Sequence, residues 1–342
     1  MIDKILLYAK KHRSSDVHLS SGYPPALRID GEIVAIPDAP SLNPNQVIEM
    51  VTSLMNDLQK RNYKEKLELD FSIQINEELR FRVNAFYTVR GPAAVFREIP
   101  LEIKSLATIH APEVVRGLCS YNKGLILVVG PTGSGKSTTL AAMIEHINSN
   151  YARHIITVED PVEFIHKNKK SLINQREVGN STLSFANALK SALREDPDVI
   201  LVGELRDVET IQLALTAAET GHLVLGTLHT SSAAQTINRI IDVFPTDDKS
   251  VVRTMLSSSL KAVISQRLLK RNGGGRIASH EVMLANSSIR NLIREDKIPQ
   301  INSIIELSKK AGMSLMKDSV SDLLAKGFIT QEIADEALVG ND

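Results

Sequence analysis

The 342 residues include 40 basic and 40 acidic side chains, so the formal net charge is zero, and 43% of the residues are hydrophobic. This balance is ordinary for a globular protein and counts modestly against a nonspecific nucleic-acid binder, which usually carries a basic excess. The length predicts two domains, because single hydrophobic cores stop growing at roughly 250–300 residues. Cys119 is the only cysteine, which excludes an internal disulfide and a four-cysteine zinc site.

The hydropathy pattern predicts a cytoplasmic protein. No stretch approaches the ~20 apolar residues of a membrane span, and residues 1–4 lack the pattern of a signal peptide. We therefore expect any membrane association to depend on partner proteins.

Residues 1–100 are predicted to form a small α/β domain. Apolar spacing indicates helices near residues 2–9 and 47–58. Alternation of apolar and polar residues predicts strands at 15–20, 26–32, 71–75, 81–85 and 93–96, with a loop at 76–78.

Alternation in the strand at 81–85 also predicts which face of the sheet carries arginine side chains. If Phe81 and Val83 face the core, Arg80 and Arg82 share the opposite face, and Arg97 follows the neighbouring strand. From the residues alone, a solvated face is the favoured interpretation of these arginines, because most charged side chains lie on the surface.

Residues 101–112, punctuated by Pro100 and Pro112, are predicted to be a linker, and 113–342 a second α/β domain. Its apolar strands alternate with helices, which is typical of a parallel βαβ sheet. The predicted strands are 125–129, 155–158, 199–204 and 223–227. After residue 245 the pattern predicts mainly helices, among them 287–294, 314–326 and a short one from Thr330.

A phosphate-binding motif lies between the strand at 125–129 and an apolar helical stripe. It fits G-x-x-x-x-G-K-[ST] at every fixed position, in the strand–loop–helix context that the chemistry requires. Glycines allow backbone N–H groups to converge on phosphate oxygens, and the helix N-terminus adds partial positive charge. The predicted nucleotide-binding residues are Gly130, Pro131, Thr132, Gly133, Ser134, Gly135, Lys136, Ser137 and Thr138.

Hydrolysis also needs a carboxylate near the γ-phosphate and a charge that stabilises the transition state. Glu204 ends an apolar strand and is the predicted base, while Glu159, Asp160 and Glu163 follow another strand. The expected metal is Mg²⁺, bound by Ser137 and by Glu204, the latter directly or through water. Two histidines bracket the strand at 223–227, His222 before it and His229 after it. Because His229 follows the carboxyl end of the strand, a nucleotide-sensing role for it stands beside the alternative of a structural histidine.

Four sequence boxes occur in order: 130–137, 156–163, 194–204 and 220–230. With them, the chain resembles the secretion ATPases of type II, type IV and type IV pilus systems. The resemblance covers the whole chain, including residues 15–19, 82–86 and 95–100.

The resemblance implies a homohexamer of two-domain subunits, a PAS-like N-terminal domain before a RecA-like ATPase domain with helices at its C-terminal end. It implies that Arg82 and Arg97 face the nucleotide phosphates, that Glu204 is catalytic and that Glu163 supports it. His222 and His229 carry over as residues near the nucleotide.

Within the family, the chain looks most like the pilus retraction ATPases. It lacks the tetracysteine insert of assembly ATPases, and residues 288–295 match a retraction motif except that serine replaces alanine at Ser288. This implies ATP-driven pilin depolymerisation and twitching motility through an inner-membrane platform protein, at the cytoplasmic face of that membrane. The alternatives are another secretion-family ATPase, a RecA-like nucleic-acid translocase and a non-catalytic ring member. The neutral charge offers little support for a nucleic-acid partner.

Overall fold

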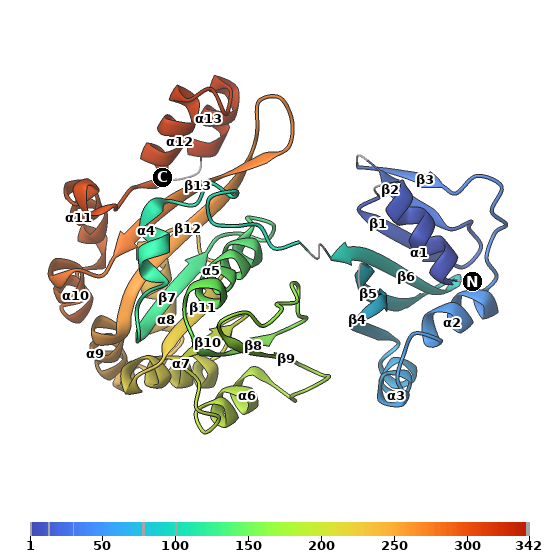
Figure 1. Ribbon diagram of the computed structural model, residues 1–342, viewed down its shortest axis with the longest axis horizontal. Helices are drawn as coiled ribbons and strands as arrows, with labels where there is room; N and C mark the ends of the chain where they lie inside the picture. Colours follow the sequence, from blue (N-terminus) through green and yellow to red (C-terminus); the bar gives the residue numbers. More distant parts are fainter. Residues whose placement is uncertain (1, 13, 30, 77–78, 100–101, 340–342) are drawn as a thin grey trace. The chain divides into compact units, whose positions relative to one another are not determined.

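The computed structural model describes residues 2–12, 14–29, 31–76, 79–99 and 102–339 (Figure 1). The chain divides into two compact units, Met1–Glu102 and Ile103–Asp342. Two positions named in the sequence analysis, the loop residues 77–78 and Pro100, lie outside the described residues.

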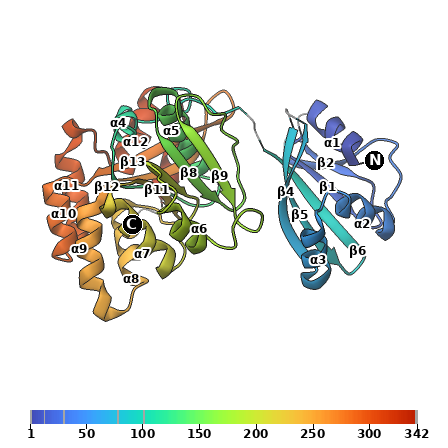
Figure 2. The same cartoon turned by 60° about the horizontal axis from the view of Figure 1, so that its bottom comes forward.

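The first unit contains a six-stranded antiparallel sheet with the strand order β3-β2-β1-β6-β5-β4 (Figure 2). Its elements are α1 (Ile2–Lys11), β1 (Asp16–Ser20), β2 (Ala26–Ile29), β3 (Glu32–Ala35), α2 (Pro44–Thr52), α3 (Asp57–Lys66), β4 (Glu68–Asn76), β5 (Leu79–Thr88) and β6 (Gly91–Ile99). The three helices pack their apolar residues against one face of this sheet.

Strand β5 alternates as predicted. Phe81 and Val83 are buried in the core, where the Phe81 ring meets Phe96 edge to face with centroids 6.5 Å apart. Arg82 lies on the other face, directly opposite Arg97 of β6. Arg80 shares that face but is buried, and its guanidinium donates a hydrogen bond to Ser72 Oγ at 2.8 Å.

The helix predicted over residues 47–58 is instead two helices. α2 ends at Thr52, and α3 begins at Asp57 after the N-cap residue Asn56. The Asn56 side chain accepts a hydrogen bond from the backbone N–H of Gln59, and the Gln59 side chain accepts one from the backbone N–H of Asn56. This capping box starts a new helix, because it satisfies N–H groups that a continuous helix would bond to preceding carbonyls.

A seven-stranded sheet forms the centre of the second unit, with the order β13-β12-β7-β11-β10-β8-β9. Its strands are β7 (Gly124–Val129), β8 (His154–Glu159), β9 (Leu172–Glu177), β10 (Val199–Val202), β11 (Leu223–Leu228), β12 (Leu260–Lys270) and β13 (Arg276–Leu284). All neighbouring strands are parallel except β12 and β13.

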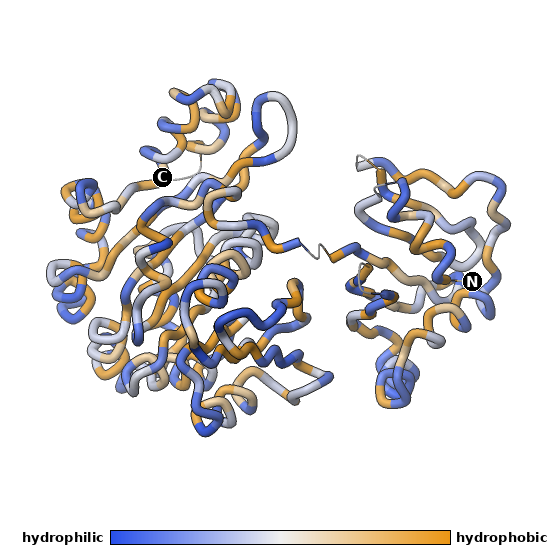
Figure 3. The backbone as a smooth tube through the Cα atoms, in the orientation of Figure 1, coloured by the Kyte–Doolittle hydropathy of each residue, from blue (hydrophilic) through white to orange (hydrophobic). Residues whose placement is uncertain are grey.

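Helices cover both faces of this sheet. They are α4 (Glu113–Leu118), α5 (Lys136–Asn150), α6 (Phe185–Ala192), α7 (Val208–Thr220), α8 (Ala233–Asp242), α9 (Lys249–Ser259), α10 (Ser287–Arg294), α11 (Ile301–Leu307), α12 (Met316–Ala325) and α13 (Gln331–Leu338). Alternate residues of β7 enter different layers: Ile126 packs with α4 and α5, whereas Leu127 packs with α6 to α9. Figure 3 shows the C-terminal helices alternating between hydrophilic and hydrophobic segments, as amphipathic helices do.

The prediction of mainly helical structure after residue 245 is wrong for residues 260–284. These form the hairpin β12–β13, with a loop at Gly273, Gly274 and Gly275, and β12 pairs in parallel with β7. β12 lies inside the sheet and buries consecutive residues of both faces over 262–266, so it lacks the alternation of a half-buried strand. Periodicity alone does not distinguish such a run from a buried helix.

The segment predicted as a linker contains no helix or strand in its described part, 102–112. It is nevertheless attached to the second unit, because Leu106 is buried among core residues and the His110 ring lies 5.6 Å from that of Phe328. Among the described residues, none of the helices combines the length and apolar character needed to cross a bilayer.

Candidate active site

The predicted phosphate-binding loop connects β7 to α5. Gly130, Gly133 and Gly135 all have positive φ, at 147°, 79° and 89°, a region that side chains with a Cβ rarely adopt. Lys136, Ser137 and Thr138 form the first turn of α5, whose N–H groups lack partners within the helix. The loop and the helix start therefore form the backbone arrangement that binds phosphate.

Lys136 is held inside this loop. Its side chain is buried, and the ammonium donates hydrogen bonds to the carbonyl oxygens of Gly130 at 2.7 Å and Pro131 at 3.1 Å. Burial lowers the pKa of Lys136, while the charges of Glu204 and Glu163 act in the opposite direction. These carboxylates compensate in part for the loss of hydration around a buried ammonium.

Glu204 follows β10 at the carboxyl edge of the sheet. The residues before and after it are hydrogen-bonded to the two flanking strands. Gly203 N–H donates to Val158 O of β8 at 2.8 Å, and Leu205 N–H donates to Thr227 O of β11 at 2.9 Å. The backbone of residue 204 is thereby fixed between β8 and β11. Ligands of parallel α/β sheets bind at this edge, where the P-loop also lies.

Four side chains form a continuous polar chain from the P-loop to Glu204. Lys136 Nζ lies 3.5 Å from His229 Nδ1, His229 Nε2 lies 3.4 Å from Glu204 Oε2, and the same oxygen accepts a hydrogen bond from Arg206 Nη2 at 2.7 Å. Burial alone raises the pKa of Glu204, but Arg206 and His229 together hold it below its ordinary value. Glu204 is therefore ionised at neutral pH.

The second acidic segment, after β8, approaches the same edge. The Glu159 carboxylate is partly buried and accepts hydrogen bonds from Thr157 Oγ1 at 2.6 Å, from Gln175 Nε2 at 3.2 Å and from the backbone of Glu163. Burial raises the pKa of Glu159, and its hydrogen bonds to Thr157 and Gln175 hold the segment in place. Glu163 contributes negative charge near Lys136.

This geometry agrees with comparisons to known proteins. The family model described as Type II/IV secretion system protein matches residues 1–335. The chain belongs to this family.

Two curated relatives match nearly the whole chain. One, from Pseudomonas aeruginosa, is named type IV pilus retractation ATPase PilT; it is 52% identical over 335 residues, 98% of this chain and 97% of that protein. The other, from Neisseria gonorrhoeae, is named twitching motility protein; it is 56% identical over 329 residues, covering 94% and 88%. A crystal structure of the pilus retraction motor PilT with bound ADP has a TM-score of 0.92 and 47% identity, covering 99% of this chain and 96% of that one.

These findings confirm the predicted fold class and enzyme class. The second unit has the α/β fold of secretion ATPases, and the chain is an ATP-hydrolysing member of the family. The Ser137 hydroxyl at the start of α5 and the carboxylates of Glu204 and Glu163 are oxygen donors near the P-loop. This donor set suits Mg²⁺.

One predicted nucleotide-binding residue lies elsewhere. His222 precedes β11, so it is at the amino edge of the sheet, whereas His229 follows β11 at the carboxyl edge. The intervening strand separates them by about 20 Å at the usual rise per residue. His222 Nδ1 lies 3.0 Å from Ala217 O, and its carbonyl accepts a hydrogen bond from Gly124 N–H. His222 therefore does not belong to the site around the P-loop of this chain.

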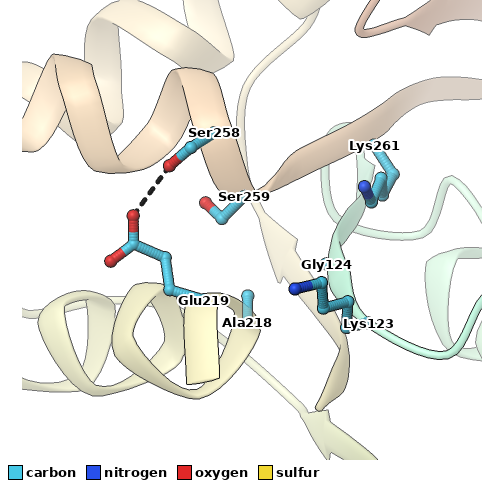
Figure 4. Close-up of a pocket in the computed structure, with 7 residues that line it drawn as sticks. All are labelled: Lys123, Gly124, Ala218, Glu219, Ser258, Ser259 and Lys261. Carbon is cyan, nitrogen blue, oxygen red and sulfur yellow. Dashed lines mark hydrogen bonds between the residues drawn. The ribbon is translucent and has the colours of Figure 1, made fainter. Parts of the chain in front are cut away.

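A cavity of about 200 Å³ lies at this amino edge (Figure 4). It is lined by Lys123, Gly124, Ala218, Glu219, Ser258, Ser259 and Lys261. The C-terminal ends of α7 and α9 border it, and helix C-termini carry partial negative charge. Lys123 and Lys261 add positive charge to the lining, and Glu219 adds one negative charge.

Arg82 and Arg97 lie in the first unit. Arg82 is half exposed, and its Nε lies 3.8 Å from Asp70 Oδ1. Arg97 Nε donates to Asp16 Oδ1 at 2.8 Å, and Asp16 is only 5% exposed. Arg97 therefore neutralises a buried carboxylate within its own unit, whereas Arg82 has only a weak surface pair.

Two residues at the site were missed by the sequence analysis. Arg206 gave a weak signal, a basic residue two positions after the strand-end Glu204. Gln266 gave none, because β12 was not recognised as a strand. Gln266 becomes visible only when β12 and β7, which are distant in the sequence, are placed side by side.

Proposed function

We propose that this chain is a hexameric motor that hydrolyses ATP to drive retraction of a type IV pilus. The observation that carries the proposal is the chain of contacts from Lys136 through His229 to Glu204 and Arg206 beside the P-loop. It combines a phosphate cradle with an ionised carboxylate, which a binding module without catalysis does not require. The names of the two close relatives support the pilus assignment.

The side chains divide the chemistry among them. When ATP binds, Lys136 exchanges its bonds to Gly130 O and Pro131 O for bonds to the β- and γ-phosphates, which are charge-assisted and stronger. Glu204 orients a water molecule and receives its proton as the oxygen attacks the γ-phosphorus and the bond to the β-phosphate oxygen breaks. His229 and Arg206 keep Glu204 ionised and in position. Ser137 and Glu204 would hold Mg²⁺, which would supply positive charge to the phosphates when bound.

A nucleic-acid translocase is the alternative from another class. ATPase activity of the full chain, measured with and without single-stranded DNA, separates the two. We expect activity that DNA does not stimulate; a large stimulation by DNA would favour the translocase.

Arginines of the first unit complete the site in this proposal. We expect Arg82→Ala to lower ATPase activity at least tenfold in the hexamer, because a positive charge at the transferring phosphate is lost. The melting temperature should hardly change, since a half-exposed ion pair contributes about 0–1 kcal/mol. Steady-state ATPase assays combined with thermal unfolding measure both quantities.

The design of this test depends on which arginine is changed. Arg97→Ala is the poorer choice, because it removes the nearer of the two cations beside buried Asp16 and so changes stability as well as activity. Arg61→Ala, an exposed arginine on α3 of the same unit, is the matched control. Wild-type activity in Arg82→Ala, or a fully active monomer, would argue against this arrangement.

Helix α10 carries the retraction motif. Ile289, Leu292 and Ile293 are buried, whereas Ser288 is exposed, so its extra hydroxyl has no burial cost. Arg290 Nε donates to Ala285 O at 2.9 Å. Packing thus explains the apolar face of the helix, but it does not explain the exposed Arg294.

We expect the double variant Arg290→Ala with Arg294→Ala to fold and to retain at least half of the ATPase activity, yet to fail in pilus retraction. Retraction is measured as twitching motility of cells that carry the variant as their only copy. Lys297→Ala, an exposed cation just beyond α10, serves as the control. Normal twitching in the double variant would reduce α10 to a packing helix.

The proposed partner is the platform protein of the pilus machinery, and the proposed place of action is the cytoplasmic face of the inner membrane. Both rest on the retraction assignment, because a motor that shortens a pilus must transmit force to the membrane-embedded base.

A further inference from the structure

The side chain of Gln266 lies directly against the P-loop. It belongs to β12, which runs parallel to β7, and its neighbour Ser265 pairs with Val129, the last residue before the loop. Gln266 is only 2% exposed. A primary amide buried to this extent must bond through both its oxygen and its nitrogen, or lose hydration without compensation.

Both halves of the amide bond to the nucleotide-binding segment. Gln266 Nε2 donates to Ser134 O at 2.7 Å, and Gln266 Oε1 accepts from Thr139 Oγ1 at 2.7 Å. Ser134 lies in the middle of the loop, and Thr139 lies in the first turn of α5 and is 1% exposed. One side chain therefore connects the middle of the loop to the start of the helix.

The glycines of the motif are in close contact with the same residue. A Cβ at Gly130 would lie 2.3 Å from the Gln266 carbonyl oxygen, and a Cβ at Gly135 would lie 2.8 Å from Gln266 Nε2. Side chains other than glycine at these positions would push β12 away from the loop. Close packing against Gln266 is therefore one reason why both positions require glycine.

We propose that Gln266 is a positioning residue for nucleotide binding. It fixes the distance between Ser134 and the first turn of α5, and so sets how the loop N–H groups converge on the phosphates. It acts through the loop and the helix start and touches no reacting atom. The inference rests on the proposed ATP hydrolysis at this site and adds the strand that shapes the cradle.

The test compares nucleotide affinity in two variants of the full-length protein. Gln266→Met keeps the length of the side chain and removes both hydrogen bonds. We expect the Kd for ADP, measured by titration calorimetry, and the KM for ATP to rise at least tenfold, while kcat at saturating ATP stays within about threefold. Affinity should fall because the loop is no longer preorganised, and kcat should be nearly unchanged because Glu204 keeps its position.

A control variant separates an effect on nucleotide binding from a general loss of stability. Leu256→Ala, a cavity-forming change in the buried face of α9, lowers stability without touching the P-loop and should leave the Kd for ADP unchanged below its melting temperature. Gln266→Met with a Kd within twofold of wild type, whether or not its melting temperature falls, would overturn the proposal.

A second variant covers the case in which Gln266→Met does not fold. Thr139→Val is nearly isosteric and removes one of the two bonds from the other side, so the Kd should rise about threefold. If both single variants fold, the double variant should bind ADP no more weakly than Gln266→Met alone, because the two residues share one interaction. Unchanged affinity in Thr139→Val would contradict the proposal. Wild-type protein without ATPase activity would instead reject the proposed function.

Discussion

Glu204→Gln should bind ATP as wild type does and yet lose turnover by roughly 10²–10⁴-fold, the contribution of a positioned general base. The amide keeps the size of the side chain and an oxygen that accepts a hydrogen bond from the Arg206 guanidinium, but it cannot accept a proton from water. The contacts of Lys136 with the loop carbonyls do not involve Glu204, so the phosphate cradle is preserved. Fluorescent-nucleotide binding and phosphate release measure the two quantities separately.

The matched control for this variant is Glu209→Gln. It makes the same chemical change at an exposed position on α7, where Glu209 pairs with Lys190. Its turnover should equal that of wild type. Hydrolysis by Glu204→Gln at near the wild-type rate would remove Glu204 from the role of base.

Lys136→Ala should weaken both binding and turnover. An ammonium bonded to phosphate oxygens contributes about 3 kcal/mol, so the Kd for ATP should rise roughly 100-fold. The melting temperature without nucleotide should change less, because the buried Lys136 already has a lowered pKa and its hydration loss is relieved on removal. Binding titrations and thermal unfolding, each with and without ATP, test this expectation.

Two further variants isolate the charge of Lys136 from its packing. Lys136→Met keeps the aliphatic length inside the loop and should bind ATP as poorly as the alanine variant. Lys123→Ala removes a lysine at the opposite edge of the sheet and should leave affinity unchanged. Wild-type affinity in Lys136→Met would mean that packing, rather than charge, accounts for the loss.

Local sequence signals located the P-loop and the carboxylate that follows β10. The P-loop between β7 and α5 and the strand-end position of Glu204 depend on residues close together in the chain, and the parallel sheet brings them to one edge. Helix α10 was predicted with its observed bounds, because its apolar positions follow a clear helical period.

Nonlocal pairing explains most of what the sequence did not reveal. β12 pairs with β7 from more than 130 positions further along the chain, and no local pattern encodes that register. The bonds of Gln266 follow from this pairing. His222 illustrates a related difficulty, since two histidines of one motif are separated by the length of a strand and reach opposite edges of the sheet.

The most direct test of the central claim is motility in the organism that encodes this chain. The gene is deleted and replaced with the wild-type or the Glu204→Gln form, and twitching and surface pili are scored together. We expect the deletion and Glu204→Gln strains to keep their pili but not to twitch, and the wild-type copy to restore movement. Normal twitching in the deletion strain, with no second retraction ATPase present, or in the Glu204→Gln strain would contradict the assignment of this site as the source of retraction force.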